Sequence, residues 1–312
     1  MANCANCGAT LVGAYCQACG QKRFVESDRR FGHLLRQFAE GATDLDGRIW
    51  RTLRALVFRP GLLSLEYIEG RRARWIAPIS LFLAISVVYF VAPLHGDLAQ
   101  QFNQQVPGWM RQRAAEPGKE FSAEERAATG QIHSPYTTRW IDERVRVCNA
   151  ERLALSEGAH GYDYRDYRID YDAKSDDVSK ALIVLHVPFT ALALMLLLAP
   201  RRRYFAEHFI VALHFYTFYL LALLIAWQSY RLSQIALPPA WVAPERALDW
   251  FMRVLLVSYS VLSLRRSYRI GWMWAAFAGI GMLGAAVATN LYVYRTVTFV
   301  ATFALTGTGS CP

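Results

Sequence analysis

The sequence has few charged residues for its length, and it lacks several patterns that would indicate a known chemistry. Only 19% of its 312 residues are charged, against about a quarter in ordinary soluble domains. It contains no GxSxG, HExxH or P-loop pattern. Its start, Met1-Ala2-Asn3-Cys4, has neither the basic nor the apolar region of a secretory signal. The apolar content of 54% excludes a disordered chain, and the gathering of these residues into long blocks almost free of charge excludes a simple soluble globular enzyme.

The apolar residues are gathered into blocks of about 20 residues, the length that a helix needs to cross a bilayer core of ~30 Å. Backbone polar groups find no water partners in lipid, so each block is expected to be helical. The five blocks are residues 76–94, 181–199, 209–227, about 247–264, and 270 to about 294. We therefore predict an all-α polytopic membrane protein with about five transmembrane helices. Residues 296–305 are too short to span, and we interpret them as a continuation of the fifth helix or an interfacial end, with a sixth span as the alternative.

Basic residues next to the spans predict the orientation. They form three clusters: Arg59, Arg71, Arg72 and Arg74; Arg201, Arg202 and Arg203; Arg265, Arg266 and Arg269. All three clusters lie on one side if the chain has five spans and a cytoplasmic N-terminus. The C-terminus and the insert of residues 95–180, in which acidic residues outnumber basic ones, are then extracytoplasmic. We expect a multi-pass protein of the bacterial cytoplasmic membrane. The net charge of +9 reflects this topology, and no nucleic-acid partner is expected.

Two cysteine pairs near the N-terminus have the spacing of a zinc ribbon. Cys4, Cys7, Cys16 and Cys19 form two C-x2-C turns, each followed by glycine. Two such turns can hold four thiolates around one Zn²⁺, and a closed four-sulfur site is structural rather than catalytic. Because so short a segment cannot bury an adequate core, metal binding, worth on the order of 10 kcal/mol, would provide its folding energy. Two disulfides or a redox-active pair are the alternatives, and a reducing cytosol argues against disulfides.

The other two cysteines, Cys148 and Cys311, both fall outside the cytoplasm in this topology. One hypothesis is a disulfide that ties the insert to the C-terminus. The alternative is a pair of unrelated free thiols, and a sixth span would remove the pairing.

The segment before the first span is charged but periodic. Ile49, Leu53, Leu56 and Val57 recur at helical spacing beside several arginines, and Pro60-Gly61 then ends the helix. A basic amphipathic helix here is expected to lie on the anionic lipid surface, with packing against the protein's own spans as the alternative. The predicted domains are the zinc ribbon at residues 1–24, this juxtamembrane segment at 25–75, and the membrane domain at 76–312 with the insert 95–180.

Several short patterns resemble one bacterial membrane-protein family, the domain-of-unknown-function 3667 family. The resemblance rests on the cysteine knuckles up to Gln21, on Arg51-Thr52-Leu53 and Pro60-Gly61, on Tyr67-Ile-Glu-Gly-Arg-Arg72, on Pro78, and on Glu207-His208. It covers most of the chain except the insert. It supports the architecture and carries no established activity.

Few ionisable residues lie within the predicted spans, and charges there are costly. Glu207 and His214 share a helix face about 10 Å apart, and with His186 they are candidates for a polar path through the membrane. The alternative is that Glu207 makes an ion pair near Arg201–Arg203 while the histidines form hydrogen bonds between helices. Gly279, Gly281 and Gly284 match GxGxxG, but within an apolar helix they indicate close helix packing instead of nucleotide binding.

In the insert, the alternating tyrosines from Tyr162 to Asp172 suggest a short strand or an extended loop. We hypothesise a non-enzymatic adaptor or sensor, whose ribbon binds a cytosolic protein while the chain is held in the lipid bilayer. A transporter or channel using His186, Glu207 and His214 is the first alternative. A membrane-embedded enzyme, using the region from Tyr162 to Asp177 or the same His and Glu residues, is the second.

Overall fold

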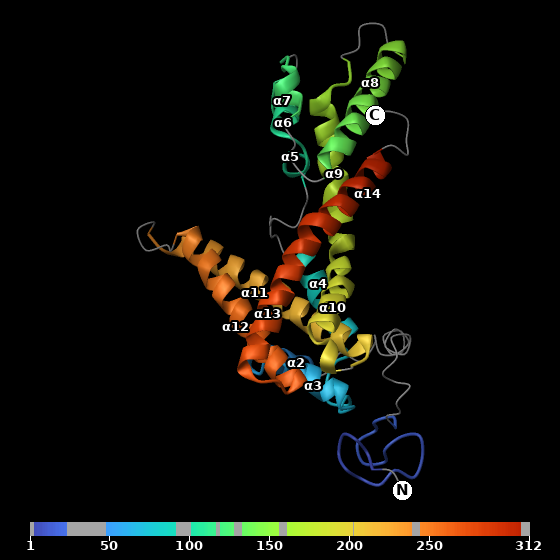
Figure 1. The fold of residues 1–312 in the computed structure, drawn as a ribbon, viewed down its shortest axis with the longest axis vertical. Helices are drawn as coiled ribbons and strands as arrows, with labels where there is room; N and C mark the ends of the chain where they lie inside the picture. Colours follow the sequence, from blue (N-terminus) through green and yellow to red (C-terminus); the bar gives the residue numbers. More distant parts are fainter. Residues whose placement is uncertain are drawn as a thin grey trace. The chain divides into compact units, whose positions relative to one another are not determined.

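The structure is a computed structural model that describes residues 3–23, 48–91, 101–116, 119–127, 133–155, 161–201, 203–238 and 244–306. Within these ranges the chain is mostly helical, except for residues 3–23, and has no β-strand beyond two isolated bridges near the N-terminus (Figure 1). The all-α fold class predicted from the sequence is confirmed. The chain divides into two compact units. The first unit contains residues 1–94 and 187–287, and the second contains residues 95–186 and 288–312.

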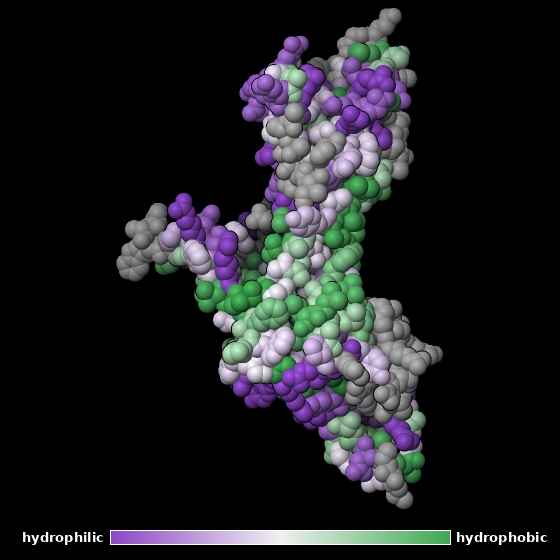
Figure 2. Space-filling view, viewed as in Figure 1, coloured by the Kyte–Doolittle hydropathy of each residue, from purple (hydrophilic) through white to green (hydrophobic). Residues whose placement is uncertain are grey.

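Four helices are long and apolar enough to cross a bilayer, so the chain is a multi-pass membrane protein. Two of them, Tyr164–Leu197 and Trp272–Thr306, are composites. The first joins α9 (Tyr164–Leu182), a short 3₁₀ turn and α10 (His186–Leu197), and the second joins α13 (Trp272–Ala288), a π-helical turn and α14 (Arg295–Thr306). The other two are α11 (Phe205–Ala236) and α12 (Glu245–Tyr268). Figure 2 shows apolar side chains gathered over α13, with hydrophilic side chains where α12 turns into α13.

The first predicted span is shorter than expected. Its helix, α4 (Pro78–Val91), has 14 residues and no charge. At 1.5 Å per residue it rises about 21 Å, which is less than the ~30 Å of a bilayer core. It packs along α11 in the first unit, and residues 92–94 of the predicted span lie outside the described ranges.

Two expectations about helix boundaries are settled by the composite helices. Residues 296–305 continue the fifth predicted helix, so the sixth-span alternative is wrong. The strand predicted from Tyr162 to Asp172 is also wrong, because α9 begins at Tyr164 with a capping box between Asp163 and Asp166. Tyr164, Tyr167 and Tyr171 recur at i, i+3 and i+7, which is helical spacing that the local alternation concealed.

The predicted juxtamembrane helix is α2 (Arg48–Phe58), and after Pro60-Gly61 the chain forms α3 (Leu62–Ile68). We call residues 48–69 the α2–α3 segment. One face of α2 is buried at Thr52, Ala55 and Leu56, and α3 packs against both α11 and α12. The hydroxyl of Tyr259 on α12 donates a hydrogen bond of 3.1 Å to the carbonyl oxygen of Leu56. The α2–α3 segment therefore packs against the protein's own helices, as the alternative interpretation held, while its opposite face stays exposed.

Gly61 lies close to the backbone of α12. It has a positive φ of 75°, and an added Cβ would lie 2.4 Å from the carbonyl oxygen of Ser263. The hydroxyl of Ser267 donates a hydrogen bond of 3.3 Å to the carbonyl oxygen of Gly61. Any side chain here would meet backbone atoms that cannot move without shifting α12, and the left-handed conformation would add strain.

The glycines of the GxGxxG pattern do pack closely, but only two of the three take part. A Cβ on Gly279 would lie 3.1 Å from Ser260 and Val261 of α12, and one on Gly281 would lie 2.9 Å from Leu197 of α10. Nothing lies within 4 Å of a Cβ on Gly284. The first two let neighbouring helices approach, as is typical of small residues in membrane helices.

The second unit has an aromatic core formed by three long helices and two short ones. The long helices are α9, α14 and α8 (Ser134–Leu155), and the short ones are α5 (Phe102–Gln105) and α6 (Gly108–Ala115). The unit also contains α7 (Ala123–Ala127). His133 lies at its edge with 5% of its surface exposed, stacked on Phe299 at 4.7 Å. Its ring nitrogens make hydrogen bonds with Thr137 and Gln105. Burial, together with the smaller effect of the positive charge of Arg295, lowers the pKa of His133 to about 4.

We expect Gly61→Ala to lower the thermal unfolding midpoint in detergent by several degrees, corresponding to roughly 2 kcal/mol or more, because of the clash with Ser263 and the strained φ. Circular dichroism during heating measures this. The matched control is Gly284→Ala, which adds the same methyl group in open space on a helix and should be neutral or slightly stabilising. Equal midpoints for Gly61→Ala and the wild type would contradict the close packing.

We expect acid to destabilise the second unit through His133. Because its folded pKa of about 4 lies below the unfolded value of about 6.5, the unfolded chain binds a proton first. Stability is therefore lost as the pH falls from about 6.5 toward 4, by about 2 kcal/mol at pH 5. Unfolding midpoints between pH 7.5 and pH 5 should fall more steeply in the wild type than in His133→Gln. Parallel pH profiles would show that His133 is not the titrating group.

Candidate metal centre

The N-terminal residues form two similar knuckles, each closed by backbone hydrogen bonds. The N–H of Gly8 donates to the carbonyl oxygen of Cys4 at 2.9 Å, and the N–H of Gly20 donates to that of Cys16 at 2.9 Å. Both glycines have positive φ, 78° and 70°, which lets the chain turn sharply after the second cysteine of each pair. The bridges Asn3–Thr10 and Tyr15–Lys22 close the two loops. The repeated sequence thus forms two similar loops whose cysteine side chains lie close to one another.

The four sulfur atoms converge on one point. The Sγ atoms of Cys4, Cys7, Cys16 and Cys19 all lie within 4.8 Å of one another, and Cys4 and Cys16 are buried. The Sγ atoms of Cys4 and Cys19 are 3.7 Å apart, and those of Cys7 and Cys16 are 3.5 Å apart. These separations are far longer than a disulfide bond of about 2.05 Å and close to the roughly 3.8 Å edge of a tetrahedron with 2.3 Å metal–sulfur bonds. The four thiols can therefore hold one metal ion.

A single glutamine joins the ribbon to the α2–α3 segment. The side chain of Gln21 is 9% exposed, and its Nε2 donates a hydrogen bond of 2.6 Å to the carbonyl oxygen of Gly70. Its Oε1 accepts hydrogen bonds from the N–H groups of Arg72 at 3.0 Å and Ala73 at 3.1 Å. One side-chain amide thus satisfies three backbone groups in the loop of residues 70–73, which we call the 70–73 loop. That loop leads from α3 toward α4.

Charged side chains stabilise the 70–73 loop from the other side. The guanidinium of Arg71 donates hydrogen bonds of 2.9 and 2.7 Å to Oε1 of Glu66, and it also pairs with Glu69. Glu69 pairs in addition with Arg269, which follows α12. Burial raises the pKa of Glu66, but the hydrogen bonds from Arg71 outweigh it, so this pKa lies below its usual value. The carboxylate of Glu66 therefore stays ionised and holds Arg71 in place, while Glu69 joins Arg71 to Arg269.

The three residues proposed to line a polar path make separate contacts. Glu207, at the start of α11, is 3% exposed and pairs with Arg203 at 3.2 Å. His214 lies seven residues further along α11, and its Nδ1 is 2.9 Å from the hydroxyl oxygen of Ser64 on α3. His186 belongs to the second unit, where its ring is tilted against that of Tyr294 and its Nε2 lies 3.4 Å from the amide nitrogen of Asn290. The path through them remains a prediction, while ion pairing and hydrogen bonding between helices account for the contacts seen.

His208 has a partner that could not be predicted from the sequence. Its Nδ1 lies 2.7 Å from the hydroxyl oxygen of Tyr268 at the end of α12, and the two rings stack with centroids 5.4 Å apart. The guanidinium of Arg203 lies over the ring of Tyr268 at 5.2 Å. Glu207-His208 thus joins α11 to α12 with buried polar contacts. Neither Ser64 nor Tyr268 stands in a pattern that predicts such a role, because the contacts link residues far apart in the chain.

The remaining predicted residues lie in the second unit. Cys148 is 3% exposed and disulfide-bonded, whereas Cys311 lies outside the described residues, so their pairing remains a prediction. The acidic residues of α9 are engaged in different places. The carboxylate of Asp170 accepts a hydrogen bond of 2.6 Å from Tyr162, and Asp176 pairs with Lys180. Among the described residues only the four cysteines form a group of three or more potential metal ligands.

Comparison with known proteins gives one match. No curated protein and no solved structure matches the chain. The match spans the α2–α3 segment, the 70–73 loop and most of α4, and so contains the surface to which Gln21 binds. Over residues 46–90 the chain is similar to the family described as protein of unknown function (DUF3667), and the resemblance inferred from the sequence is confirmed.

Proposed function

We propose that the protein is a non-enzymatic adaptor or sensor of the bacterial cytoplasmic membrane, in which a zinc-loaded cytosolic ribbon is joined to the membrane helices. The observation that carries the proposal is the set of three hydrogen bonds made by Gln21 to the 70–73 loop. Gln21 follows the last ribbon cysteine by two residues. The 70–73 loop follows directly after the α2–α3 segment, which packs against α11 and α12. A structural change in the ribbon would therefore alter the contacts of this segment with the two helices.

Zinc is the metal that fits four thiolates best. A tetrahedral site of four cysteines is typical of structural Zn²⁺, and its closed coordination leaves no position for a substrate. In a segment this small the metal supplies the folding energy, so loss of the metal would unfold the ribbon. Unfolding would also withdraw Gln21, since the N–H of Cys16 bonds to the carbonyl oxygen of Gln21 at 2.8 Å within the second knuckle. Loss of the metal would therefore break the hydrogen bonds between Gln21 and the 70–73 loop.

The proposed orientation has the ribbon inside the cell and the C-terminus outside. It rests on the basic residues at the helix ends, which favour the cytoplasmic side. The ion pair between Arg269 and Glu69 supports it, because residues in contact must lie on the same side of the membrane. That contact puts the turn after α12 beside the end of α3, so two of the three basic clusters share a side. The insert of residues 95–180 would then be extracytoplasmic.

The ribbon also has an exposed surface for a cytosolic protein partner. Val12 is 81% exposed and Tyr15 is 61% exposed, although both are apolar or aromatic. Exposed aromatic residues on a small rigid module are typical anchors of protein interfaces. The metal knuckles would hold this surface rigid, while Gln21 anchors the module to the membrane protein.

We expect Gln21→Ala to speed amide hydrogen exchange at Arg72 and Ala73 by about tenfold, because their N–H groups lose a buried acceptor. Exchange followed by mass spectrometry of the full-length protein in nanodiscs measures this. Cys4→Ser should lose the bound zinc, as determined by elemental analysis, and show the same faster exchange. The matched control is Gln17→Ala, which removes an exposed glutamine from the same ribbon and should change neither quantity.

Two outcomes would contradict this linkage. Unchanged exchange in Gln21→Ala would show that the ribbon is not held by the glutamine. Loss of zinc from Cys4→Ser with normal exchange at Arg72 and Ala73 would show that the metal and the 70–73 loop are independent.

We expect the partner to bind through Tyr15. Cross-linking in the native host followed by affinity capture should recover a cytosolic protein with the wild type and several-fold less of it with Tyr15→Ser, because a hot-spot aromatic residue contributes about 2 kcal/mol or more. Gln17→Ala serves as the control for a nearby exposed change. Recovery of the same proteins in equal amounts from all three forms would contradict an adaptor role for the ribbon.

A further inference from the structure

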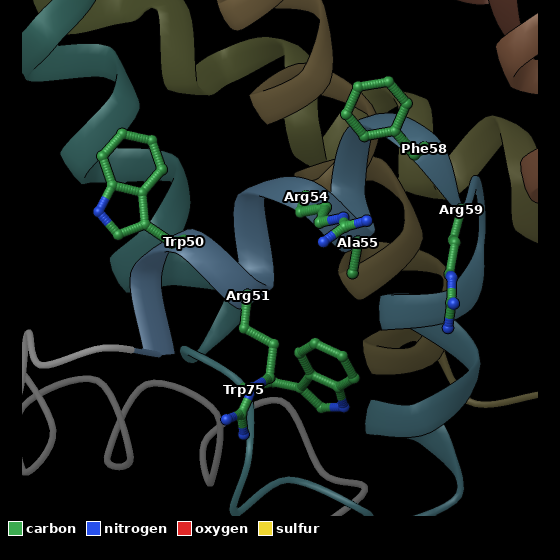
Figure 3. Close-up of a pocket in the computed structure, with 7 residues that line it drawn as sticks. All are labelled: Trp50, Arg51, Arg54, Ala55, Phe58, Arg59 and Trp75. Atoms are coloured by element: carbon green, nitrogen blue, oxygen red, sulfur yellow. The ribbon is translucent and has the colours of Figure 1, made fainter.

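The exposed side of α2 borders a cavity of about 800 Å³ that is rich in arginine and tryptophan. Figure 3 shows its lining, most of which α2 and the residue after it provide. The lining residues are Trp50, Arg51, Arg54, Ala55, Phe58, Arg59 and Trp75. Three of the seven carry a positive charge and none carries a negative one. The volume lies within the range of small-molecule sites.

The three arginines have no acidic partner among the residues that the structure describes. In the part of the chain that the structure describes, Arg71, Arg203 and Arg269 all form ion pairs with glutamates, whereas no ion pair involves Arg51, Arg54 or Arg59. Three unpaired guanidinium groups around one cavity repel one another and attract an anion. Guanidinium groups bind phosphate oxygens particularly well because their planar fork can donate two parallel hydrogen bonds.

Exposed aromatic residues at the same cavity indicate a lipid surface. Trp50 is 78% exposed and Phe58 is 77% exposed on a helix that leads into a membrane domain. Tryptophan is enriched at the level of lipid headgroups, where its ring is apolar and its N–H meets water. A soluble anion would gain nothing from these rings, whereas a lipid would contact both the rings and the arginines.

Phe58 lines both this cavity and a second, apolar groove. The groove has a volume of about 890 Å³ and lies between α11 and α12, and none of the described residues that line it is charged. Along α11 it extends from Phe218 to Ser233, which is about 22 Å at 1.5 Å per residue. Half of a bilayer core measures only about 15 Å, so the groove is long enough for the acyl chains of one leaflet.

We propose that α2 and the α11–α12 groove together form a binding site for an anionic diacyl phospholipid. The phosphate lies among Arg51, Arg54 and Arg59, Trp50 and Trp75 contact the headgroup region, and the acyl chains follow the groove past Phe58. Charge complementarity selects an anionic headgroup over a zwitterionic one, and the uncharged groove selects a lipid over a free anion. The site does not depend on the ribbon or on its metal, so it stands independently of the adaptor function.

The test is native mass spectrometry of the full-length protein released from nanodiscs that contain equal amounts of phosphatidylglycerol and phosphatidylcholine. The wild type should retain phosphatidylglycerol in preference to phosphatidylcholine. Replacing two of the arginines, Arg51→Gln with Arg54→Gln, should lower this preference by about tenfold, since each arginine near an anionic surface contributes on the order of 1 kcal/mol. The matched control, Arg201→Gln with Arg266→Gln, removes the same charge from exposed arginines elsewhere in the first unit and should keep the preference.

Two further arms identify the occupant. Ala222→Trp fills the groove and should reduce retention of phosphatidylglycerol while the unfolding midpoint stays normal. Excess inorganic phosphate should not displace the lipid, because the acyl chains hold it. Equal loss of preference in both arginine pairs would mean a general charge effect and would overturn the site. Retention without any headgroup preference in the wild type, or displacement by phosphate, would overturn it as well.

Discussion

The contact between Gly61 and α12 fixes the α2–α3 segment, and the rest of the first unit is built around it. A glycine with a positive φ lets the backbone of the turn approach Ser263 more closely than any side chain would permit. Hydrogen bonds from Ser267 and Tyr259 to carbonyl oxygens of the turn and of α2 then replace the partners that water would otherwise supply. A helix pair this short has little stability alone, so its position follows from these contacts with α12 and from the packing of α3 on α11.

Once the α2–α3 segment is fixed, two parts of this region can bind other groups: the 70–73 loop that follows α3, and the exposed face of α2. The 70–73 loop presents a carbonyl and two N–H groups in an arrangement that one glutamine amide can satisfy completely, and Gln21 does so. The opposite face of α2 presents three arginines, and α11 and α12 form an apolar groove that shares Phe58 with their cavity. Both features depend on the same packing, and the family match of residues 46–90 covers the segment that provides them.

The sequence predicts the features that depend on local chemistry and misses those that depend on distant partners. Uncharged runs of sufficient length predicted the long helices, and the repeated cysteine spacing predicted the sulfur cluster, because each signal is complete within a short stretch of chain. The strand expected from Tyr162 to Asp172 failed because alternation over a few residues masked the helical spacing of Tyr164, Tyr167 and Tyr171. The hydrogen bonds between Gln21 and the 70–73 loop could not be predicted from the sequence, since the partners of Gln21 lie about fifty residues away and are backbone atoms that any residue provides.

The contacts of the buried polar residues of α11 are those expected of side chains that fix how helices pack, rather than of side chains that line a conducting path. His214 meets Ser64 of α3, and His208 meets Tyr268 of α12, so each histidine joins α11 to a different neighbour at a different level. Glu207 is held by Arg203 one turn before it. Within membrane proteins such hydrogen bonds contribute on average only about 0.6 kcal/mol each, but they specify which helix faces which. Apolar side chains cover every helix and therefore do not specify which helices pack together. These few hydrogen bonds select the arrangement in which α3 lies against α11 and α12. They thereby keep the 70–73 loop where the ribbon can reach it.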